Sequence, residues 1–124
     1  METTTALSAL SALSQEHRLA IFRLLVEQGP EGLPAGMIGE RLQLAPATLS
    51  FHLKELSHAG LVAARQNGRF IYYRADYTAM NGLVAYLTEN CCRASVCAPS
   101  CAPTKPGRAN AGKRRVSPQK RRSA

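Results

Sequence analysis

Apolar side chains recur at helical spacing along most of the chain, and the spacing changes to that of strands in one short stretch. Leucines at every third position predict a short helix with one apolar stripe over residues 6–13. A more extensively apolar pattern predicts a core helix over residues 15–28, with Ser14 as its cap. A short helix over residues 35–42 and a closing helix over residues 77–90 follow the same period. The pattern therefore predicts a mainly helical fold.

The segment from Ala45 to Gly60 has the most specific helical pattern in the chain. Pro46 at the first helical position and Gly60 just beyond the end bracket a helix of about 13 residues. A short helix, a tight turn and this second helix describe a helix-turn-helix, whose second helix enters the major groove of DNA. Its predicted buried stripe is Leu49, Leu53 and Leu56, and Thr48, Ser50 and Phe51 are expected at base edges or simply as exposed helix. The outward residues expected at DNA are Ala47, Thr48, Ser50, Phe51 and Lys54.

Beyond Gly60 the apolar period becomes that of strands. Two β-prone runs, residues 61–66 and 70–75, are joined around Asn67-Gly68, a dipeptide that favours a type I′ hairpin turn. Arginines on this hairpin would lie along DNA phosphates, as in the wing of a winged helix-turn-helix. The predicted fold is mainly α with a small β-hairpin (α+β), with about five helices and a two-stranded wing. The wing residues expected at DNA are Arg65, Asn67 and Arg69.

The first and last predicted helices have more apolar surface than a small monomer can bury. We therefore expect these two helices to pair with those of a second copy across a two-fold axis, which gives a homodimer. The predicted interface residues are Leu7, Leu10, Leu13, Met80, Leu83, Val84 and Leu87.

The formal charge of +8 comes entirely from residues 102–124, because the eight basic and eight acidic side chains before them cancel. This end of the chain has three prolines and no large apolar side chain, so its composition predicts disorder. A basic tail can attract nucleic acid or simply keep a protein soluble, and the sequence leaves both roles open. The predicted organisation is a DNA-binding and dimerisation domain over 1–92, a cysteine-containing segment over 93–104 and a disordered basic tail over 105–124.

The sequence contains no run of about 18 apolar residues for a membrane span, and its N-terminus lacks the basic start of a signal peptide. We therefore expect a cytoplasmic protein whose thiols stay reduced. The sequence implies no membrane contact and no protein partner other than a second copy.

Three segments resemble the winged-helix repressors of the arsenical-resistance (ArsR/SmtB) family: HRLAIFRLLVEQG, LPAGMIGERLQLAPATLSFHLKELSHAGLV and RQNGRFIYYRA. The resemblance covers about residues 5–92. It implies a homodimer that binds a palindromic operator as a repressor and leaves the operator when a metal or metalloid effector binds. It implies no permanent cofactor and no enzymatic activity.

All four cysteines lie within eleven residues, directly after the last predicted helix. Two effector sites of the family are missing, because Met37 to Glu40 replace a Cys-x-Cys on the third helix and no histidine lies on the last helix. The remaining resemblance is to members with a C-terminal arsenite site. Thiolates are the ligands that soft ions select, and three of them satisfy trigonal As(III) or Sb(III). The expected ligands are Cys91, Cys92 and Cys97, with Cys101 as the alternative third ligand.

Other roles for the cysteines stay open. Four thiolates could hold zinc, and the same thiols could form disulfides in a redox or thiol-stress sensor on the same scaffold. A thiol enzyme is less favoured, because it needs a base beside the thiol and no histidine is near the cluster in sequence. On an intact helix Cys91 and Cys92 would point about 100° apart, so effector binding is expected to unwind or bend the end of the last helix.

Overall fold

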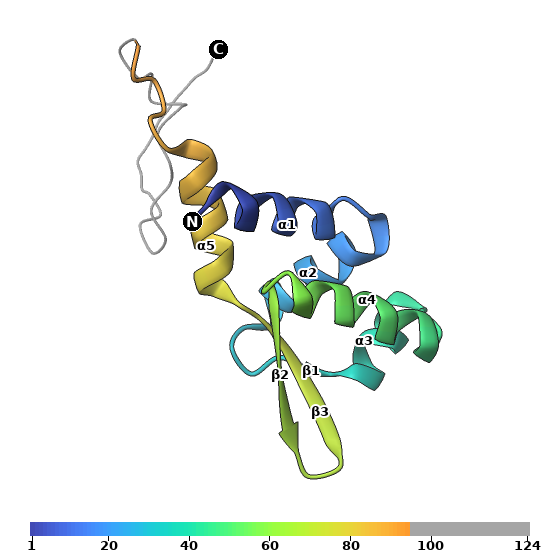
Figure 1. Cartoon of the computed structure of the whole chain (residues 1–124). Helices are drawn as coiled ribbons and strands as arrows, with labels where there is room; N and C mark the ends of the chain where they lie inside the picture. The colour runs from blue at the N-terminus through green and yellow to red at the C-terminus, as the bar shows by residue number, and fades with distance from the viewer. Residues whose placement is uncertain (95–124) are drawn as a thin grey trace, which may run out of the picture. The chain divides into compact units, whose positions relative to one another are not determined.

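The computed structural model describes residues 1–94, and within them the chain folds into five helices and three short strands. Contacts divide the chain into two compact units, Met1–Leu87 and Thr88–Ala124, of which the first holds the winged helix-turn-helix. Among the described residues no helix is both long and apolar enough to cross a membrane. In chain order the elements are α1 Thr3–Leu13, α2 Glu16–Gln28, β1 Leu33–Pro34, α3 Ala35–Leu42, α4 Pro46–His58, β2 Val62–Asn67, β3 Phe70–Ala75 and α5 Tyr77–Thr88 (Figure 1).

The predicted fold class is confirmed, with one additional strand. The sheet has three antiparallel strands in the order β1-β3-β2, where the sequence predicted two. In β1, Leu33 pairs with Tyr73 and Pro34 pairs with Tyr72. A strand of two residues is too short to show an alternation of apolar and polar positions, and its Gly- and Pro-rich surroundings have the composition of a loop. The sequence pattern therefore did not predict this strand.

The wing turn differs from the predicted one. Asn67 pairs with Phe70, so the two residues of the loop are Gly68 and Arg69 and not Asn67 and Gly68. Gly68 has a φ of +65°, and Arg69 is not among the residues with positive φ. A type I′ turn needs positive φ at both central residues, whereas type II′ needs it only at the first, usually as glycine. The prediction of a type I′ turn at Asn67-Gly68 is therefore wrong, and the backbone fits type II′.

The core forms where α1, α2 and α4 pack together over the sheet. Ile21, Leu25, Ile38, Leu56 and Leu61 are completely buried in it. The predicted stripe of α4 is confirmed, because all three of its leucines are buried. In α1 the buried residues are Ala6, Ala9 and Ala12, while the neighbouring leucines of the predicted stripe face outward or are only partly covered.

The start of α2 is capped differently from the prediction. Gln15 Oε1 accepts a hydrogen bond from the backbone N–H of Arg18 (3.0 Å). Ser14 Oγ donates to the carbonyl oxygen of Ser11 (2.8 Å) and so closes the last turn of α1. The glutamine side chain therefore supplies the acceptor that an N-terminal helix turn requires, and the predicted role of Ser14 as the cap is wrong.

Gly32 and Gly60 provide a matched test of how closely β1 approaches β3. Both have positive φ, +74° and +77°. A Cβ at Gly32 would overlap the carbonyl oxygen of Tyr73 and lie 2.8 Å from its carbonyl carbon, whereas a Cβ at Gly60 meets nothing within 4 Å. We expect Gly60→Ala to lower the free energy of unfolding by about 1 kcal/mol through backbone strain alone.

Gly32→Ala adds the clash to the same strain, and we expect it to lower the free energy of unfolding by at least about 2 kcal/mol more than Gly60→Ala. Urea unfolding followed by circular dichroism measures both variants. Equal losses in the two variants would contradict the close contact between β1 and β3.

Candidate nucleic-acid interface and thiol pair

The outer face of α4 presents the residues predicted to contact bases. Ala47, Thr48, Ser50 and Lys54 are exposed, and Phe51 is 56% exposed despite its size. The face is set by packing on the opposite side, where Leu49, Leu53 and Leu56 are buried. The structure therefore brings all five predicted residues of the recognition helix, α4, to one accessible surface.

The tight packing of α3 on α4 fixes the helix-turn-helix. Gln43 adopts a left-handed conformation (φ 56°) after the last residue of α3, and the N–H of Leu44 bonds the carbonyl oxygen of Gly39 (2.9 Å). A Cβ at Gly39 would lie 3.2 Å from the Leu44 oxygen and 3.3 Å from Leu49 Cδ2, so only glycine fits without displacement. The absence of a side chain at Gly39 thus lets the backbone of α3 lie close to the turn and to Leu49 of α4.

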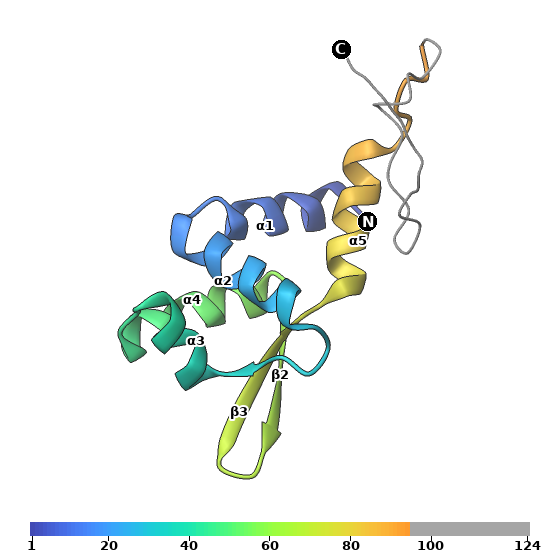
Figure 2. The same cartoon turned by 180° about the vertical axis from the view of Figure 1, so that it is seen from behind.

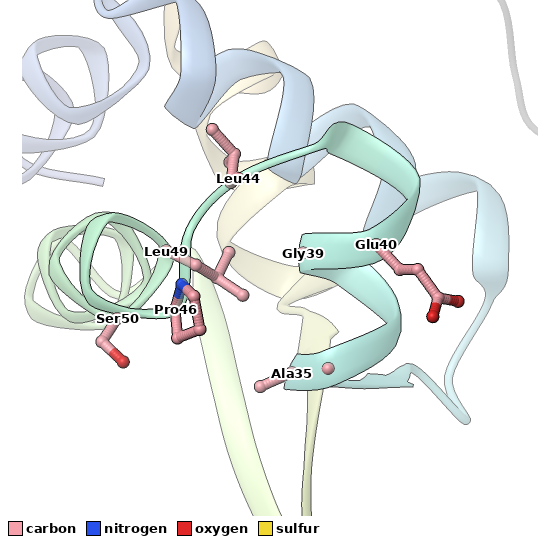
Figure 3. Close-up of a pocket in the computed structure, with 8 residues that line it drawn as sticks. Ala35, Gly39, Glu40, Leu44, Pro46, Leu49 and Ser50 are labelled. Carbon is pink, nitrogen blue, oxygen red and sulfur yellow. The ribbon is translucent and has the colours of Figure 1, made fainter.

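A pocket of about 350 Å³ lies between α3 and the N-terminal half of α4 (Figure 3). Its polar side chains are Glu40, an exposed carboxylate, and Ser50. Because the Glu40 carboxylate repels phosphate, this pocket does not favour a DNA phosphate, whereas the arginines of the wing do. The lining residues are Ala35, Gly36, Gly39, Glu40, Leu44, Pro46, Leu49 and Ser50.

The two arginines of the wing that were predicted to contact DNA, Arg65 and Arg69, have different surroundings. Residues paired directly across the two strands share a face, so Arg65 and Tyr72 lie on the same face of the hairpin. The Arg65 guanidinium lies 5.1 Å from the centre of the Tyr72 ring, and its Nη2 donates to the carbonyl oxygen of Glu31 (3.4 Å). Arg69 is exposed in the turn itself, at the end of the hairpin that projects from the helices (Figure 1). Asn67 is exposed at the end of β2.

One buried polar contact links α4 to the helices above it. His52 is 7% exposed, and its Nδ1 lies 3.3 Å from Nη1 of Arg18 on α2. Burial lowers the pKa of His52, the charges of Arg18 and His17 lower it further, and Glu55 opposes them. Arg18 and His52 are 34 positions apart in the chain, so the local sequence pattern does not indicate their contact.

The described part of the second unit, residues 88–94, contains Cys91 and Cys92. The preceding helix α5 ends at Thr88, two residues before the predicted end, and Asn90 and Cys92 both have positive φ, 62° and 59°. The N–H of Cys91 bonds the carbonyl oxygen of Thr88 (3.0 Å) in a turn. The cysteines therefore lie beyond the last helix, so the premise that they point about 100° apart on an intact helix is wrong, and the effect of effector binding stays a prediction.

The turn brings the two thiols together. The sulfur atoms of Cys91 and Cys92 are 3.6 Å apart, Cys91 is exposed and Cys92 is partly buried. Arg93 follows at once in the chain, and its Nη1 donates to Asn90 Oδ1 (3.3 Å). Within residues 1–94 no three potential metal ligands form a group. The third predicted ligand Cys97 and its alternative Cys101 lie outside the described residues, as do the predicted tail and most of the predicted cysteine-containing segment.

The sequence of this chain matches known helix-turn-helix proteins. A family model described as a helix-turn-helix domain matches residues 13–65. The uncharacterized HTH-type transcriptional regulator YceK of Bacillus subtilis (strain 168) is 46% identical over 61 residues, which are 49% of this chain and 60% of that protein. The uncharacterized HTH-type transcriptional regulator YbzH of the same strain is 31% identical, over 65% of this chain and 93% of that protein. The chain thus spans less than two thirds of YceK and nearly all of YbzH.

Solved structures extend the likeness to three dimensions. An ArsR-like transcriptional regulator from Rhodococcus sp. RHA1 is 31% identical with a TM-score of 0.61, over 68% of this chain and 76% of that one. The homodimeric winged helix-turn-helix domain Mb0332 from Mycobacterium bovis, a possible ArsR-family regulator, is 28% identical with a TM-score of 0.57, over 70% and 81%. A possible transcriptional regulator for arsenical resistance is 28% identical with a TM-score of 0.57, over 64% and 80%.

The family model covers the helix-turn-helix, including the exposed recognition helix, and the start of β2. The relatives are transcriptional regulators and not enzymes. The chain therefore belongs to the ArsR family of winged helix-turn-helix transcriptional regulators, which use this motif to bind DNA.

Proposed function

We propose that this protein is a metalloid-responsive repressor. It binds operator DNA as a homodimer and is released when As(III) or Sb(III) is bound by the thiolates of Cys91, Cys92 and Cys97. The observation that carries the proposal is the 3.6 Å separation of the Cys91 and Cys92 sulfurs. The solved relative described as a possible regulator for arsenical resistance supports the same class of effector.

The spacing of the two sulfurs suits a shared ion. Two thiolates bound to one ion at about 2.3 Å in tetrahedral geometry lie about 3.8 Å apart, close to the distance in this turn. Soft thiolates select soft ions, and a third thiolate completes a trigonal site for As(III). Cys97 closes a shorter loop than Cys101 and therefore costs less conformational entropy.

The same spacing also suits zinc, which would use all four thiolates. A zinc sensor is therefore the second candidate, and a disulfide-forming redox sensor is the third. The three differ in the reagent that releases the protein from DNA, so one titration series separates them.

The homodimer accounts for apolar surface that one copy leaves uncovered. Leu7 and Leu87 are each 59% exposed, and Leu10 and Val84 are also exposed. Figures 1 and 2 show α1 crossing α5, and Thr3 Oγ1 and Tyr86 OH form a hydrogen bond of 2.6 Å between these helices. Leu83 is buried within the protomer, so the exposed leucines supply most of the surface for a second copy.

A groove of about 470 Å³ adjoins these helices and fits the same role. Its walls come from the end of α1, from α2 and from α5, and they include four predicted interface residues. Exposed apolar surface next to an apolar groove is typical of a protein interface. The interface residues that line the groove are Leu13, Met80, Leu83 and Val84.

Leu7 and Phe70 give a matched test of the dimer, because each is 59% exposed. Leu7→Glu places a charge on α1 where the second copy would bury it, and we expect it to shift the protein from dimer to monomer at micromolar concentration. Phe70→Glu lies on the wing and is expected to leave the mass unchanged. Sedimentation equilibrium measures both masses, and a dimeric Leu7→Glu variant would exclude this interface.

Arg69 tests the wing. We expect Arg69→Ala to weaken binding to operator and non-operator duplexes alike and to reduce the slope of log K against log salt by about 1, as one lost phosphate contact does. Gln66→Ala, a neutral change on the same hairpin, should keep the wild-type slope. Fluorescence anisotropy over a salt series supplies the measurement, on a duplex that the wild-type protein selects from random sequence. An unchanged slope in Arg69→Ala would place the turn away from phosphate.

The thiol pair is tested by release from the same duplex. Cys91→Ser and Cys92→Ser should keep operator affinity within about twofold, because neither lies in α4 or the wing, and should abolish release by As(III). Cys97→Ser should abolish release as well, and Cys101→Ser should preserve it. The reduced protein is titrated with As(III), Sb(III), Zn(II) and peroxide while anisotropy is followed.

Release by peroxide or by zinc but not by As(III) would replace the metalloid proposal with the corresponding alternative. Release by As(III) that persists in both Cys91→Ser and Cys92→Ser would place the effector site elsewhere.

A further inference from the structure

His52 is the buried polar residue of the described core, and it lies on the recognition helix. The outward residues of α4 face solvent, whereas His52 faces the body of the protein. A buried polar group needs a partner, because an unsatisfied one costs about 1–3 kcal/mol. The partner shows what His52 does for α4.

Arg18 is that partner, and it joins three helices at one corner. Its Nε donates to the carbonyl oxygen of Ala12 at the end of α1 (2.7 Å). Its backbone N–H is held by the Gln15 cap at the start of α2 (3.0 Å). Its Nη1 lies 3.3 Å from Nδ1 of His52 in the middle of α4. The bonds to Ala12 and Gln15, at the corner where α1 ends and α2 begins, therefore hold the guanidinium in position for its contact with α4.

The chemistry of this contact defines the protonation state of His52. Arginine is only a donor, so Nδ1 of His52 must be the acceptor. The ring is then neutral, with its proton on Nε2. A second proton would occupy Nδ1, remove the acceptor and place an imidazolium against a guanidinium. Protonation therefore breaks the bond and replaces it with repulsion.

The surrounding charges act in the same direction. On α2, the His17 ring centre lies 5.6 Å from that of His52, and both Arg18 and His17 oppose a positive charge there. On α4, Glu55 is the group that favours the charge. The residues of α1 include no titratable side chain. Burial is the largest influence, and together these groups lower the pKa of His52 from its ordinary value of 6.5.

We propose that the hydrogen bond between Arg18 and His52 is a proton-sensitive tether that holds the recognition helix on the α1–α2 corner and so sets operator affinity. Arg18 and His52 are positioning residues in this role, since neither belongs to the outward face of α4. The inference rests on the proposed binding of operator DNA by α4. Because α1 is also a helix of the proposed dimer interface, the tether connects that interface to the recognition helix.

The tether also makes stability depend on pH. The pKa of His52 is lower in the folded protein than in the unfolded chain, so the unfolded chain binds more protons at pH values between the two. The free energy of unfolding therefore falls as pH decreases from 6.5 toward the pKa of the folded state. Above this window the ring is neutral in both states and the full stability is present.

The decisive measurement is affinity for the selected duplex from about pH 8 to about pH 5.5 at constant ionic strength. We expect wild-type affinity to fall over this range by less than about tenfold, because the lowered pKa leaves part of the His52 population neutral at the lower pH, while affinity for a non-operator duplex holds or rises because the protein gains positive charge. His52→Gln keeps an acceptor for Arg18 but cannot titrate, so its operator affinity should match wild type at the upper pH and stay level. Circular dichroism at each pH establishes that every variant is folded.

His17→Gln is the matched control, because it removes a neighbouring imidazole and leaves the tether in place. It should retain the fall in affinity, with the midpoint at higher pH, since the charge of His17 no longer lowers the pKa of His52. A His52→Gln variant with the wild-type profile, or a level wild-type profile, would overturn the proposal.

A readout independent of DNA tests the bond itself. Long-range proton–nitrogen NMR of the full chain at about pH 8 should show Nδ1 of His52 as the unprotonated ring nitrogen. The opposite tautomer would exclude the tether even if operator affinity varies with pH. Wild-type protein that binds no duplex at any pH would instead overturn the proposed function, and the tether as a determinant of affinity with it.

Discussion

The rotation of α4 about its own axis is the constraint on which the rest of the structure depends. Successive residues of a helix point about 100° apart, so burial of one stripe fixes what the opposite face presents. Leu49, Leu53 and Leu56 are buried by at least 96% each, and rotation by one residue would place Lys54 or Glu55 in the core. Burial of a leucine contributes about 1.5–3 kcal/mol, so three of them strongly favour one orientation. The outward residues of α4, which are predicted to contact DNA, are therefore determined by the buried residues on the opposite side of the helix.

The same division between a buried and an outward face has a different consequence in α1. The buried residues are alanines, whose small side chains let the helix approach its neighbours closely, and the leucines beside them remain at the surface. A monomer gains nothing from this arrangement, because exposed leucine is unfavourable and buried alanine contributes little. A second copy covering the leucines makes the arrangement favourable. The choice of alanine inside and leucine outside thus argues for association more strongly than the amount of apolar surface alone.

The helix-turn-helix could be predicted from the sequence because its determinants are local. Pro46 and Gly60 bracket α4, and the apolar period within it identifies the buried stripe, so both α4 and its outward residues were correct. Several of the errors fall where residues far apart in the sequence decide the structure. Strand β1 exists only because Tyr72 and Tyr73 pair with it, and the wing turn follows from the register of the hairpin and not from the preferred dipeptide. The hydrogen bond between Arg18 and His52 joins residues 34 positions apart, so no local pattern indicates it. The geometry of the thiol pair depends on the left-handed conformations of Asn90 and Cys92, which no sequence pattern indicates.

The end of α5 also limits how an effector can act. Because α5 has ended before Cys91, an ion bound by the thiol pair of the proposed repressor would not have to unwind the helix to reach both sulfurs. An effector changes an equilibrium only through different affinities for two conformations. The pair alone is already close to the spacing that an ion needs, so it would distinguish weakly between two conformations of the chain. Under the proposed function the difference would come from a third thiolate, because bringing it to the pair closes a loop at an entropic cost. In the proposed repressor, Cys91 and Cys92 therefore provide affinity, and the cysteine beyond them provides the switch.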